Sequence, residues 1–468
     1  MLTYFPKYFS SRAITCYVVT LAAISLVFWS YAMPFQFMLF GFVSLTVFFV
    51  YSSQLTEKWQ RFSSKTFVRK LFTTALVIRI IYVVFIYFYY IEMTGQPYAY
   101  HTGDELYYQG SAQLWRNDGF GMFYEDINRD VAFSDSGYIW WLGFVYYVLG
   151  THVLPARLVK CVIDAFSCVL IYNLAKRNFG EYVGRIAAVF CMLMPNMWYY
   201  CGVTLKETEM AFLTILFVER ADLALRSKKI TVKNLLLPGV IMLAMFTFRT
   251  ALGAVLVAAL VAAIIMSSSR QLQTWQKVLY SIVFGIWMLL TVGSEIVEET
   301  QQLWEGRSTN QEEGYAWRAE RTGGNTFAKY ASASVFAPFI FTIPFSTMVA
   351  IPGQEPQMML NGGNFIKNIM SGLTIFALFT LLIRGDWRKH VLPMAVTAGY
   401  LVVLVFSNFA HSERFHFPVL ALELMFAAYG ISLLSNKHKR WYVLWLVGIF
   451  FANFAWAWVK LAGRGYSI

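Results

Sequence analysis

Long apolar runs recur along almost the whole chain, and they constrain the possible folds more than any other feature. Several runs approach the roughly 20 residues that an α-helix needs to cross a lipid bilayer. Of the 468 residues, 58% are hydrophobic and only 14% are charged. The sequence therefore predicts an all-α, polytopic transmembrane protein.

The basic residues lie in short clusters between these runs. The net charge of +12 could suggest nucleic-acid binding, but clusters such as "TEKWQRFSSKTFVRK" are typical of cytoplasmic loops under the positive-inside rule. We therefore expect membrane lipids, and no nucleic acid, as partners. The five cysteines contain no C-x-x-C pair, so we interpret them as core thiols, with neither a zinc site nor a disulfide framework.

Charge placement predicts about thirteen crossings, with the amino end inside. The first apolar run lacks a convincing small-x-small cleavage site and a second run follows directly, so we interpret it as a retained helix. We expect the spans near residues 13–31, 35–52, 71–91, 155–175, 184–200, 207–224, 234–248, 250–267, 278–294, 363–383, 391–408, 416–434 and 441–459.

Two apolar stretches are not counted as crossings. The run "YIWWLGFVYYVLG" is short, and counting it would move Lys176 and Arg177 outside, so we predict an interfacial or re-entrant element. The run 334–352 contains three prolines, and we expect it to be broken or re-entrant.

Two long loops are assigned to the outer face. The aromatic density of the loop 92–137 predicts helices that lie in the headgroup layer. The loop 295–333 is acidic, with seven Glu against three Arg up to Arg321.

This topology brings four groups of ionisable residues to the outer face. Such groups are costly at membrane depth and tend to mark functional cavities. The candidates are Asp104 and Glu105 in "HTGDELYY", Lys206, Glu207 and Glu209 in "LKETE", Arg249, and Arg414 and His416 in "HSERFHFP".

Each group also has a purely structural explanation. The first acidic pair suits a helix N-cap region, and Arg249 could extend to the headgroups. The carboxylates at 207 and 209 could begin a span, where side chains two positions apart point about 200° apart. The last pair could anchor a helix at the interface. The convergence of all four groups on one face favours a functional site.

A carboxylate and several cations in one place suit glycosyl transfer from a lipid phosphate. The carboxylate can remove the proton of an acceptor hydroxyl that attacks a sugar carbon. Lys, Arg or a metal can then stabilise the departing phosphate. Glu207 and Glu209 are candidate ligands for a divalent metal such as Mg or Mn.

The residues quoted above resemble the GT-C superfamily of integral-membrane glycosyltransferases. The stretches "YVLGTHVLPARLVKCVIDAFSCVLIYNLAKRNFG" and "MPNMWYYCGVTLKETEMAFL" look like the branch that contains protein O-mannosyltransferases and lipid A aminoarabinose transferases. The similarity covers roughly residues 70–225. It implies one membrane domain over 1–468, with two N-terminal spans in 1–70, a GT-C-like catalytic module in 71–295 and a variable membrane module in 296–468.

The resemblance also implies roles for the candidates. Asp104 corresponds to the acidic residue of the first outer loop, the base or acceptor-orienting group, with Glu105 beside it. Glu207 and Glu209 correspond to a metal-binding acidic pair, and Arg414 and His416 to polar residues that face the lipid phosphate. The chain departs from the family in having two spans, where one is usual, before the span that leads to the acidic loop. The absence of a large soluble domain after the membrane region argues against a multi-domain oligosaccharyltransferase.

We therefore expect an enzyme of the bacterial inner membrane with its active site on the periplasmic face. It would transfer a sugar from a polyprenyl-phosphate or polyprenyl-diphosphate carrier to a hydroxyl of a lipid, protein or glycan, with inversion at the anomeric carbon. Asp104 and Glu105 would be catalytic, and Lys206, Arg249, Arg414 and His416 would bind phosphate. A polymerase or ligase of cell-surface polysaccharide and a flippase for lipid-linked glycans are alternatives.

Overall fold

The computed structural model describes residues 2–101, 103–130, 132–227, 232–266, 323–329, 335–406 and 410–466. In these ranges every regular element is a helix, apart from an isolated β-bridge between Ala32 and Val349. The α-helices are α1 (Lys7–Val27), α2 (Phe35–Lys58), α3 (Ser64–Thr94), α4 (Gly103–Asp130), α5 (Phe133–Leu149), α6 (Val153–Phe179), α7 (Glu181–Leu193), α8 (Pro195–Cys201), α9 (Glu207–Arg226), α10 (Val232–Phe248), α11 (Thr250–Met266), α14 (Glu355–Met359), α15 (Asn361–Ile383), α16 (Val391–Val405), α17 (Glu413–Leu433) and α18 (Lys439–Ala462).

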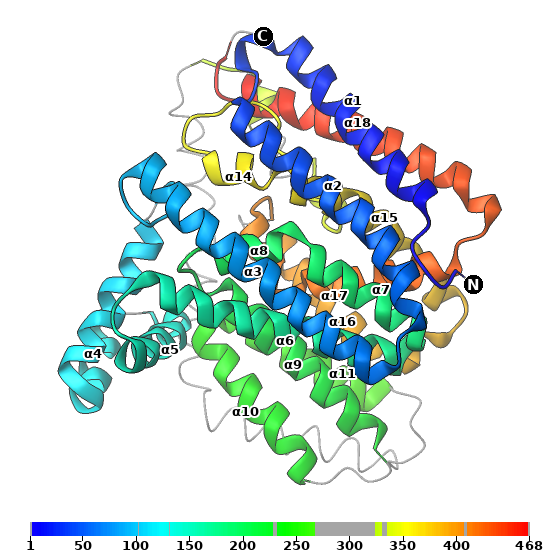
Figure 1. Ribbon diagram of the computed structural model, residues 1–468. Helices are drawn as coiled ribbons and strands as arrows, with labels where there is room; N and C mark the ends of the chain where they lie inside the picture. Colours follow the sequence, from blue (N-terminus) through cyan, green and yellow to red (C-terminus); the bar gives the residue numbers. More distant parts are fainter. Residues whose placement is uncertain are drawn as a thin grey trace.

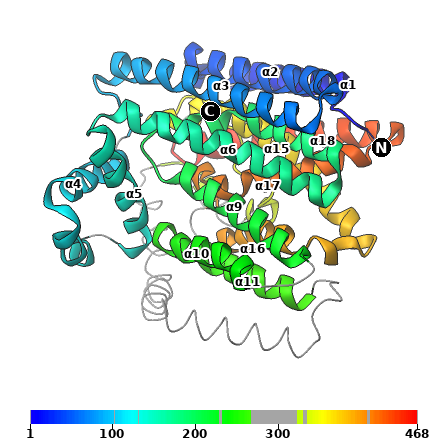
Figure 2. The ribbon, with the colours of Figure 1, turned by 60° about the horizontal axis from the view of Figure 1, so that its bottom comes forward.

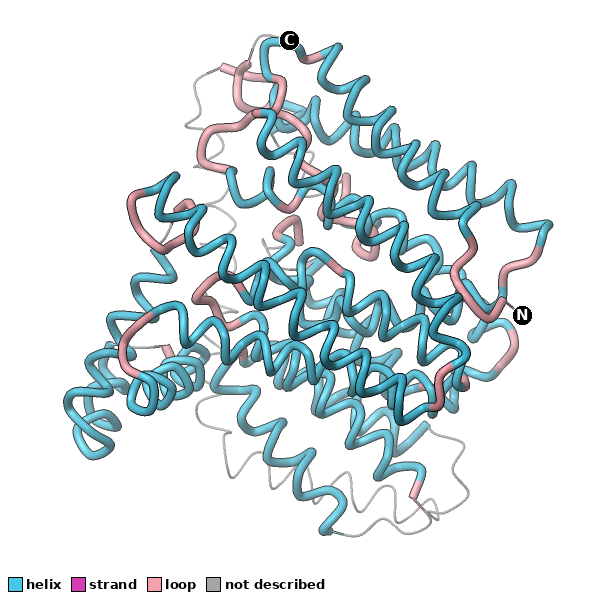
Figure 3. The backbone as a smooth tube through the Cα atoms, viewed as in Figure 1, coloured by secondary structure: helices cyan, strands magenta, loops and turns pink. Residues whose placement is uncertain are grey.

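Most long helices run side by side in one bundle (Figure 1), and most of the loops that join them gather at its two ends (Figure 3). We call the end at which α3 meets α4 the site end, and the end that holds the N-terminus the opposite end. Among the described helices, seven are long and apolar enough to cross a membrane, namely α1, α2, α3, α6, α15, α17 and α18. The all-α, membrane-spanning fold class is confirmed, whereas the exact number of crossings stays a prediction.

The described helices overlap the expected spans, because an apolar run of that length favours a helix. Several bounds differ by four to seven residues, as for α1, which was expected at 13–31, and α3, which was expected at 71–91. The helix α3 shows why its ends lie where they do. The Ser63 hydroxyl accepts a hydrogen bond from the Thr66 amide, and Gly95 ends the helix in the left-handed conformation at φ 74°. The predicted span near 278–294 and most of the loop 295–333 lie outside the described residues.

The expected span at 184–200 consists of two helices, α7 and α8. Pro195 occupies the first turn of α8, where its missing N–H costs no hydrogen bond. The indole of Trp198 donates a hydrogen bond of 2.9 Å to the Met192 carbonyl near the break. The chain then leaves α8 in a short loop that leads directly to Lys206 and Glu207.

Helices α4 and α5 lie at the site end and pack on each other (Figures 1 and 2). In Figure 2, α5 runs across the direction of α3 and α6. The close approach depends on Gly143, where an added Cβ would lie 2.5 Å from the Trp115 ring. This placement agrees with the predicted interfacial element rather than with a further crossing.

The proline-containing segment near 334–352 is non-helical after the short 3₁₀ turn Ala337–Phe339, as expected. Its polar backbone is paired by neighbouring side chains. Asn368 donates hydrogen bonds of 2.6 and 2.8 Å to the carbonyls of Thr342 and Pro344, and the Ser346 amide donates to Asn453 at 2.8 Å. Irregular backbone at membrane depth is tolerated where protein supplies such partners.

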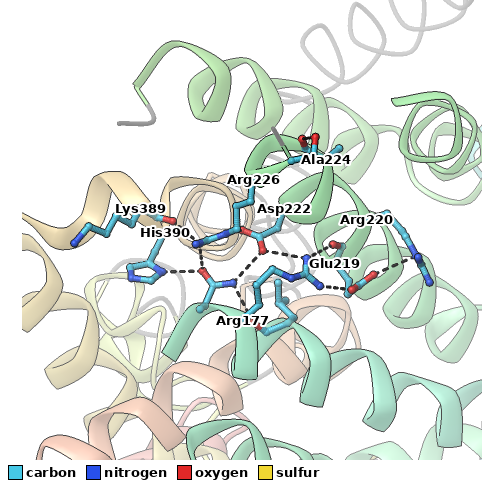
Figure 4. Close-up of polar contacts among 11 residues, drawn as sticks. Arg177, Glu219, Arg220, Asp222, Ala224, Arg226, Lys389 and His390 are labelled. Atoms are coloured by element: carbon cyan, nitrogen blue, oxygen red, sulfur yellow. Dashed lines mark hydrogen bonds and ion pairs between the residues drawn. The ribbon is translucent and has the colours of Figure 1, made fainter. Parts of the chain in front are cut away.

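A network of charged residues joins α6, α9 and the segment before α16 at the opposite end (Figure 4). Arg177 forms ion pairs with Glu219 and Asp222, and Arg226 bonds Asp222 at 2.8 Å and the Lys389 carbonyl at 2.7 Å. Burial, together with the nearby Arg226 charge, lowers the pKa of the adjacent His390 to about 4. This network fixes α9, whose other end begins at Glu207.

Candidate active site

Three helix N-termini meet at the site end, and Arg414 joins them. Its guanidinium forms ion pairs with Asp104 in the first turn of α4 and with Glu207 in the first turn of α9. The Asp104 side chain is 62% exposed, whereas that of Glu207 is fully buried. The structure therefore brings together one predicted residue from each of three segments that are distant in the sequence.

The helix termini make this point attractive for negative charge. Unpaired backbone N–H groups at a helix N-terminus carry a partial positive charge, which favours carboxylates and phosphates. Glu207 Oε1 binds Arg414, while Glu207 Oε2 is buried and accepts no hydrogen bond from the described atoms. Asp104 thus remains the accessible carboxylate, and Glu207 is the buried one that holds the guanidinium.

Glu105 lies one residue from Asp104 but points into the protein. It is 3% exposed and accepts hydrogen bonds from Arg157 at 2.9 Å, from the Thr204 amide at 2.6 Å and from the Ala99 amide at 3.0 Å. These bonds tie the start of α4 to α6 and to the loop before α9. The contacts of Glu105 suit a positioning role, and the catalytic role expected from the sequence stays a prediction.

Lys206 is likewise held inside the protein. Its ammonium donates to the carbonyls of Ser134 and Phe248, at 2.8 and 2.6 Å, and to the Asp135 carboxylate, which also accepts from Tyr108 at 2.8 Å. These three acceptors use all three N–H bonds of the ammonium. Burial lowers the pKa of Lys206, and the Asp135 charge opposes this. All three N–H bonds of Lys206 are thus directed to protein acceptors in this structure, and its role in binding the donor phosphate stays a prediction.

Arg249 remains close to the site. Its guanidinium carbon lies 4.2 Å from the centroid of the Phe415 ring, and one of its amino groups donates to the Tyr400 hydroxyl at 3.1 Å. Because Phe415 is the residue after Arg414, the two arginines lie at the same end of the bundle. Arg249 is partly buried. The aromatic ring stabilises its charge by a cation–π contact, which uses none of the N–H donors of the guanidinium.

His416 faces the core instead of the site. It is 1% exposed, its Nε2 donates to the Ala410 carbonyl at 2.7 Å, and its Nδ1 accepts from Lys367 at 2.8 Å. Lys367 is also buried and lies 3.9 Å from Glu423. Both ring nitrogens of His416 therefore have protein partners in this structure, and its phosphate-binding role stays a prediction.

The two candidate metal ligands do not converge. Glu209 accepts a hydrogen bond from the Trp141 indole at 3.3 Å and lies 3.7 Å from the Lys160 ammonium, whereas Glu207 binds Arg414. Among the residues that the structure describes, no three His, Cys, Asp or Glu side chains are grouped to hold a metal ion. In the described part of the chain, Glu207 and Glu209 thus face different cations, and the Mg or Mn site stays a prediction.

Sequence reasoning missed the basic residues of α6 that support the site. Arg157 binds Glu105, and Lys160 donates to the carbonyls of Val203 and Leu205 in the loop before α9. Both residues are buried. Two basic residues three positions apart in the apolar stretch "VLPARLVKCVID" lie on one face of a helix, and this spacing was the available signal.

Comparison with known proteins gives one family match. Residues 137–294 match the family of dolichyl-phosphate-mannose-protein mannosyltransferases. The matched segment is about a third of the chain and includes Glu207 and Arg249. None of the curated proteins matches the sequence.

One solved structure is similar in its overall course. It is the oligosaccharyltransferase of Archaeoglobus fulgidus in complex with zinc and sulfate, with a TM-score of 0.45 and 12% sequence identity. The alignment covers 84% of this chain and 53% of that chain, so the present sequence spans about half of the length of that enzyme.

The helical membrane bundle and the match of about a third of the chain to a mannosyltransferase family together support an integral-membrane glycosyltransferase. Within that class, the match to a mannosyltransferase family supports the GT-C superfamily, and the resemblance seen in the sequence is confirmed at this level.

Proposed function

We propose that this glycosyltransferase moves a sugar from a polyprenyl-phosphate or polyprenyl-diphosphate carrier to an acceptor hydroxyl, on the periplasmic face of a bacterial inner membrane. The observation that carries the proposal is the contact of Arg414 with both Asp104 and Glu207. An exposed carboxylate then lies beside a cation and several helix N-termini, which is the arrangement that this transfer needs.

The proposed step is a single displacement. The acceptor oxygen attacks the anomeric carbon while Asp104 takes its proton. The bond from that carbon to the phosphate oxygen breaks, and the phosphate leaves with the electron pair. Arg414 and Arg249 stabilise the charge that develops on the phosphate, so both arginines contribute most in the transition state. Attack from the side opposite the phosphate inverts the anomeric configuration.

The placement of the site on the outer face is supported by the basic residues of the opposite end. The segment "TEKWQRFSSKTFVRK" joins α2 to α3 there, and Lys/Arg-rich loops remain in the cytoplasm. No step of the proposal passes through a metal, because Glu207 and Glu209 face different cations.

The test compares Asp104→Asn with wild type in transfer of radiolabelled sugar from native lipid extract to endogenous acceptors. We expect the rate to fall by about 10²–10⁴-fold, the usual contribution of a general base. Asp386→Asn is the matched control, because Asp386 lies at the opposite end and its partner is Lys389. Equal transfer by Asp104→Asn and wild type, or product with retained configuration, would contradict the proposal.

A polymerase or ligase of cell-surface polysaccharide is the second candidate, and the position of Arg249 favours keeping it. Such an enzyme would depend on arginine more than on a carboxylate. If Arg249→Ala abolishes transfer while Asp104→Asn retains it, this second candidate replaces the first.

A further inference from the structure

A further carboxylate, that of Asp135, lies at the site end, and it is not among the candidates predicted from the sequence. It belongs to the first turn of α5, and its side chain is 26% exposed. Its Oδ1 accepts hydrogen bonds from the Tyr108 hydroxyl at 2.8 Å and from the Lys206 ammonium. Its Oδ2 forms no hydrogen bond with the residues that the structure describes. One oxygen is thus held by the protein, and the other is available to a ligand.

Tyr108 connects Asp135 to the residues around Arg414. It follows Asp104 by four positions on α4, so the two side chains lie on one face of that helix. Burial raises the pKa of Tyr108, the charges of Asp135 and Glu207 raise it further, and the Arg414 charge opposes this. The Tyr108 hydroxyl therefore lies within electrostatic reach of all three charges. Asp135 thus belongs to the same site as the contact of Arg414 with Asp104 and Glu207.

Lys206 connects Asp135 to Arg249. Its ammonium donates to the Asp135 carboxylate and, at 2.6 Å, to the carbonyl of Phe248, which precedes Arg249 in the chain. Burial lowers the pKa of Lys206, the Asp135 charge opposes this, and the nearby Arg249 charge adds to the lowering. Asp135 therefore lies close to one of the two arginines that the proposed mechanism assigns to the phosphate.

The first turn of α5 is held closely against two other helices. At Gly137, an added Cβ would lie 2.1 Å from the Thr247 hydroxyl oxygen and 2.8 Å from the Phe248 ring, so α5 packs tightly on the end of α10. The ring of Tyr138 lies edge-on to that of Tyr108, with 5.0 Å between the centroids. The position of the neighbouring carboxylate is therefore fixed before any substrate binds, and such a fixed group favours a specific contact.

The chemistry of the available oxygen limits what it can bind. A carboxylate accepts hydrogen bonds and repels anions, so its partner has to carry a donor and cannot be the phosphate. A hydroxyl of the donor sugar meets both conditions. The sugar is bonded to the phosphate that Arg249 contacts in the proposed mechanism, so it lies beside that phosphate. The acceptor hydroxyl is assigned to Asp104 in the same mechanism.

We propose that Asp135 determines sugar specificity, because its Oδ2 accepts a hydrogen bond from one hydroxyl of the donor sugar. The inference rests on the function proposed above, and it narrows the donor to a neutral sugar that bears this hydroxyl. A sugar with a carboxylate at that position is repelled, and a sugar without the hydroxyl leaves Oδ2 without its partner. The competing explanation is that Asp135 only neutralises the buried Lys206.

The experiment combines Asp135→Asn with donors that lack a single hydroxyl. The donors are polyprenyl phosphates of mannose, glucose and galactose, with the 3-, 4- and 6-deoxy analogues of whichever sugar wild type transfers fastest. Tyr108 and Lys206 both donate to Oδ1, so they hold the oxygen of the asparagine and turn its NH₂ group toward the substrate. The atom that faces the sugar thus changes from an acceptor to a donor. kcat/KM of the full-length protein is measured for each donor.

We expect one deoxy analogue to lose about 10- to 100-fold in kcat/KM with wild type, the usual contribution of a hydrogen bond to a charged group. Asp135→Asn should lose a similar factor on the parent sugar, and it should discriminate at most about threefold between the parent and that analogue, since the two changes remove one interaction. If every analogue lost the same factor in the variant as in wild type, or if wild type used all analogues equally, the proposal would be overturned.

Tyr108→Phe is the matched control, because it removes one bond to Oδ1 and leaves Oδ2 in place. It should keep the wild-type discrimination among the analogues, and loss of discrimination in this variant as well would count against Asp135. If Asp135→Asn does not fold because Lys206 keeps a buried charge, Asp135→Asn combined with Lys206→Gln replaces it, since that pair is neutral.

The same donors separate failure of this inference from failure of the proposed function. Transfer by wild type from native lipid extract, but from none of the three hexoses, would overturn the assignment to Asp135 and leave the function standing. Equal transfer by Asp104→Asn and wild type contradicts the function itself.

Discussion

At the residue scale, the two carboxylates of α9 should behave differently although they lie two positions apart. Glu207 binds Arg414, whereas Glu209 is paired with Lys160 and Trp141. We expect Glu207→Gln to lower kcat by about 100-fold. The neutral amide holds Arg414 less firmly, and a shift of its guanidinium by about 1 Å would disturb the contact with the phosphate. Glu209→Gln should keep most of the activity per folded molecule.

The measurement is the transfer rate of each variant at saturating donor, divided by the amount of monodisperse protein, which gives kcat for Glu207→Gln and Glu209→Gln. Tm provides the control, since Glu209→Gln leaves the Lys160 charge buried without its carboxylate and should lower Tm. If both variants lost activity equally, and added Mg²⁺ or Mn²⁺ restored it, the two residues would be metal ligands as the sequence suggested.

Substitution of Glu105 tests whether this residue, which lies beside the proposed base, only positions the start of α4 and takes no proton itself. Glu105→Gln should destabilise the protein by about 3–5 kcal/mol, because Arg157 would keep a buried charge without a charged partner. Activity should fall, but the pH dependence of kcat should keep its shape, since Glu105 exchanges no proton with substrate. A shifted acidic limb in Glu105→Gln, with an unshifted limb in Asp104→Asn, would assign the base to Glu105.

The sequence predicted the meeting of Asp104, Glu207 and Arg414 from topology, because alternating spans bring every second loop to one face. It did not predict which neighbours join them. Adjacent helix residues point about 100° apart, so Glu105 and Lys206 turn inward beside residues that face the site. Such orientations depend on helix register and on partners such as Arg157 and Asp135, which lie far away in the sequence.

At the element scale, the irregular segment before α14 should depend on Asn368. Asn368→Leu removes the donors to the carbonyls of Thr342 and Pro344, and each buried carbonyl without a partner costs about 1–3 kcal/mol. We expect Tm to fall in detergent. Thr380→Val on the same helix is the control, because the Thr380 hydroxyl bonds only the Phe376 carbonyl of its own turn. An unchanged Tm for Asn368→Leu would mean that water replaces the amide.

Element boundaries were predictable only to within several residues, since α3 begins at Ser64, inside the segment expected as a basic loop, and ends at Thr94 rather than near 91. They were harder to predict where a break is internal. The run 184–200 has the length of one span, yet the proline at 195 divides it into α7 and α8, and Trp198 closes the break by bonding the Met192 carbonyl. A mean hydropathy over the whole run does not reveal such a break, because the residues on both sides of it are apolar.

At the scale of the whole molecule, the charge network of Figure 4 and the active site lie at opposite ends of α9. This separation agrees with the two faces of a membrane protein. Basic segments gather at the end with Arg177, where anionic headgroups can solvate them, while the site end holds the exposed Asp104 carboxylate. The orientation of the bundle therefore determines which compartment supplies the acceptor.

Labelling of introduced cysteines in intact cells tests this orientation. Gln96→Cys lies in the exposed loop between α3 and α4, and Arg61→Cys and Asp386→Cys lie at the opposite end. A membrane-impermeant maleimide should label Gln96→Cys in intact cells and the other two only after permeabilisation. Four of the five native cysteines are buried, so the unsubstituted protein should give little background.

The two opposite-end positions also test the path of the chain between them. Arg61 precedes α3 and Asp386 follows α15, so equal accessibility requires an even number of crossings in between, including those in the segment 267–322. An interfacial α5 satisfies this requirement with one span near 278–294, whereas a crossing α5 would place Asp386 on the opposite face. Labelling of Asp386→Cys together with Gln96→Cys in intact cells would therefore reject the combination of an interfacial α5 with one span near 278–294.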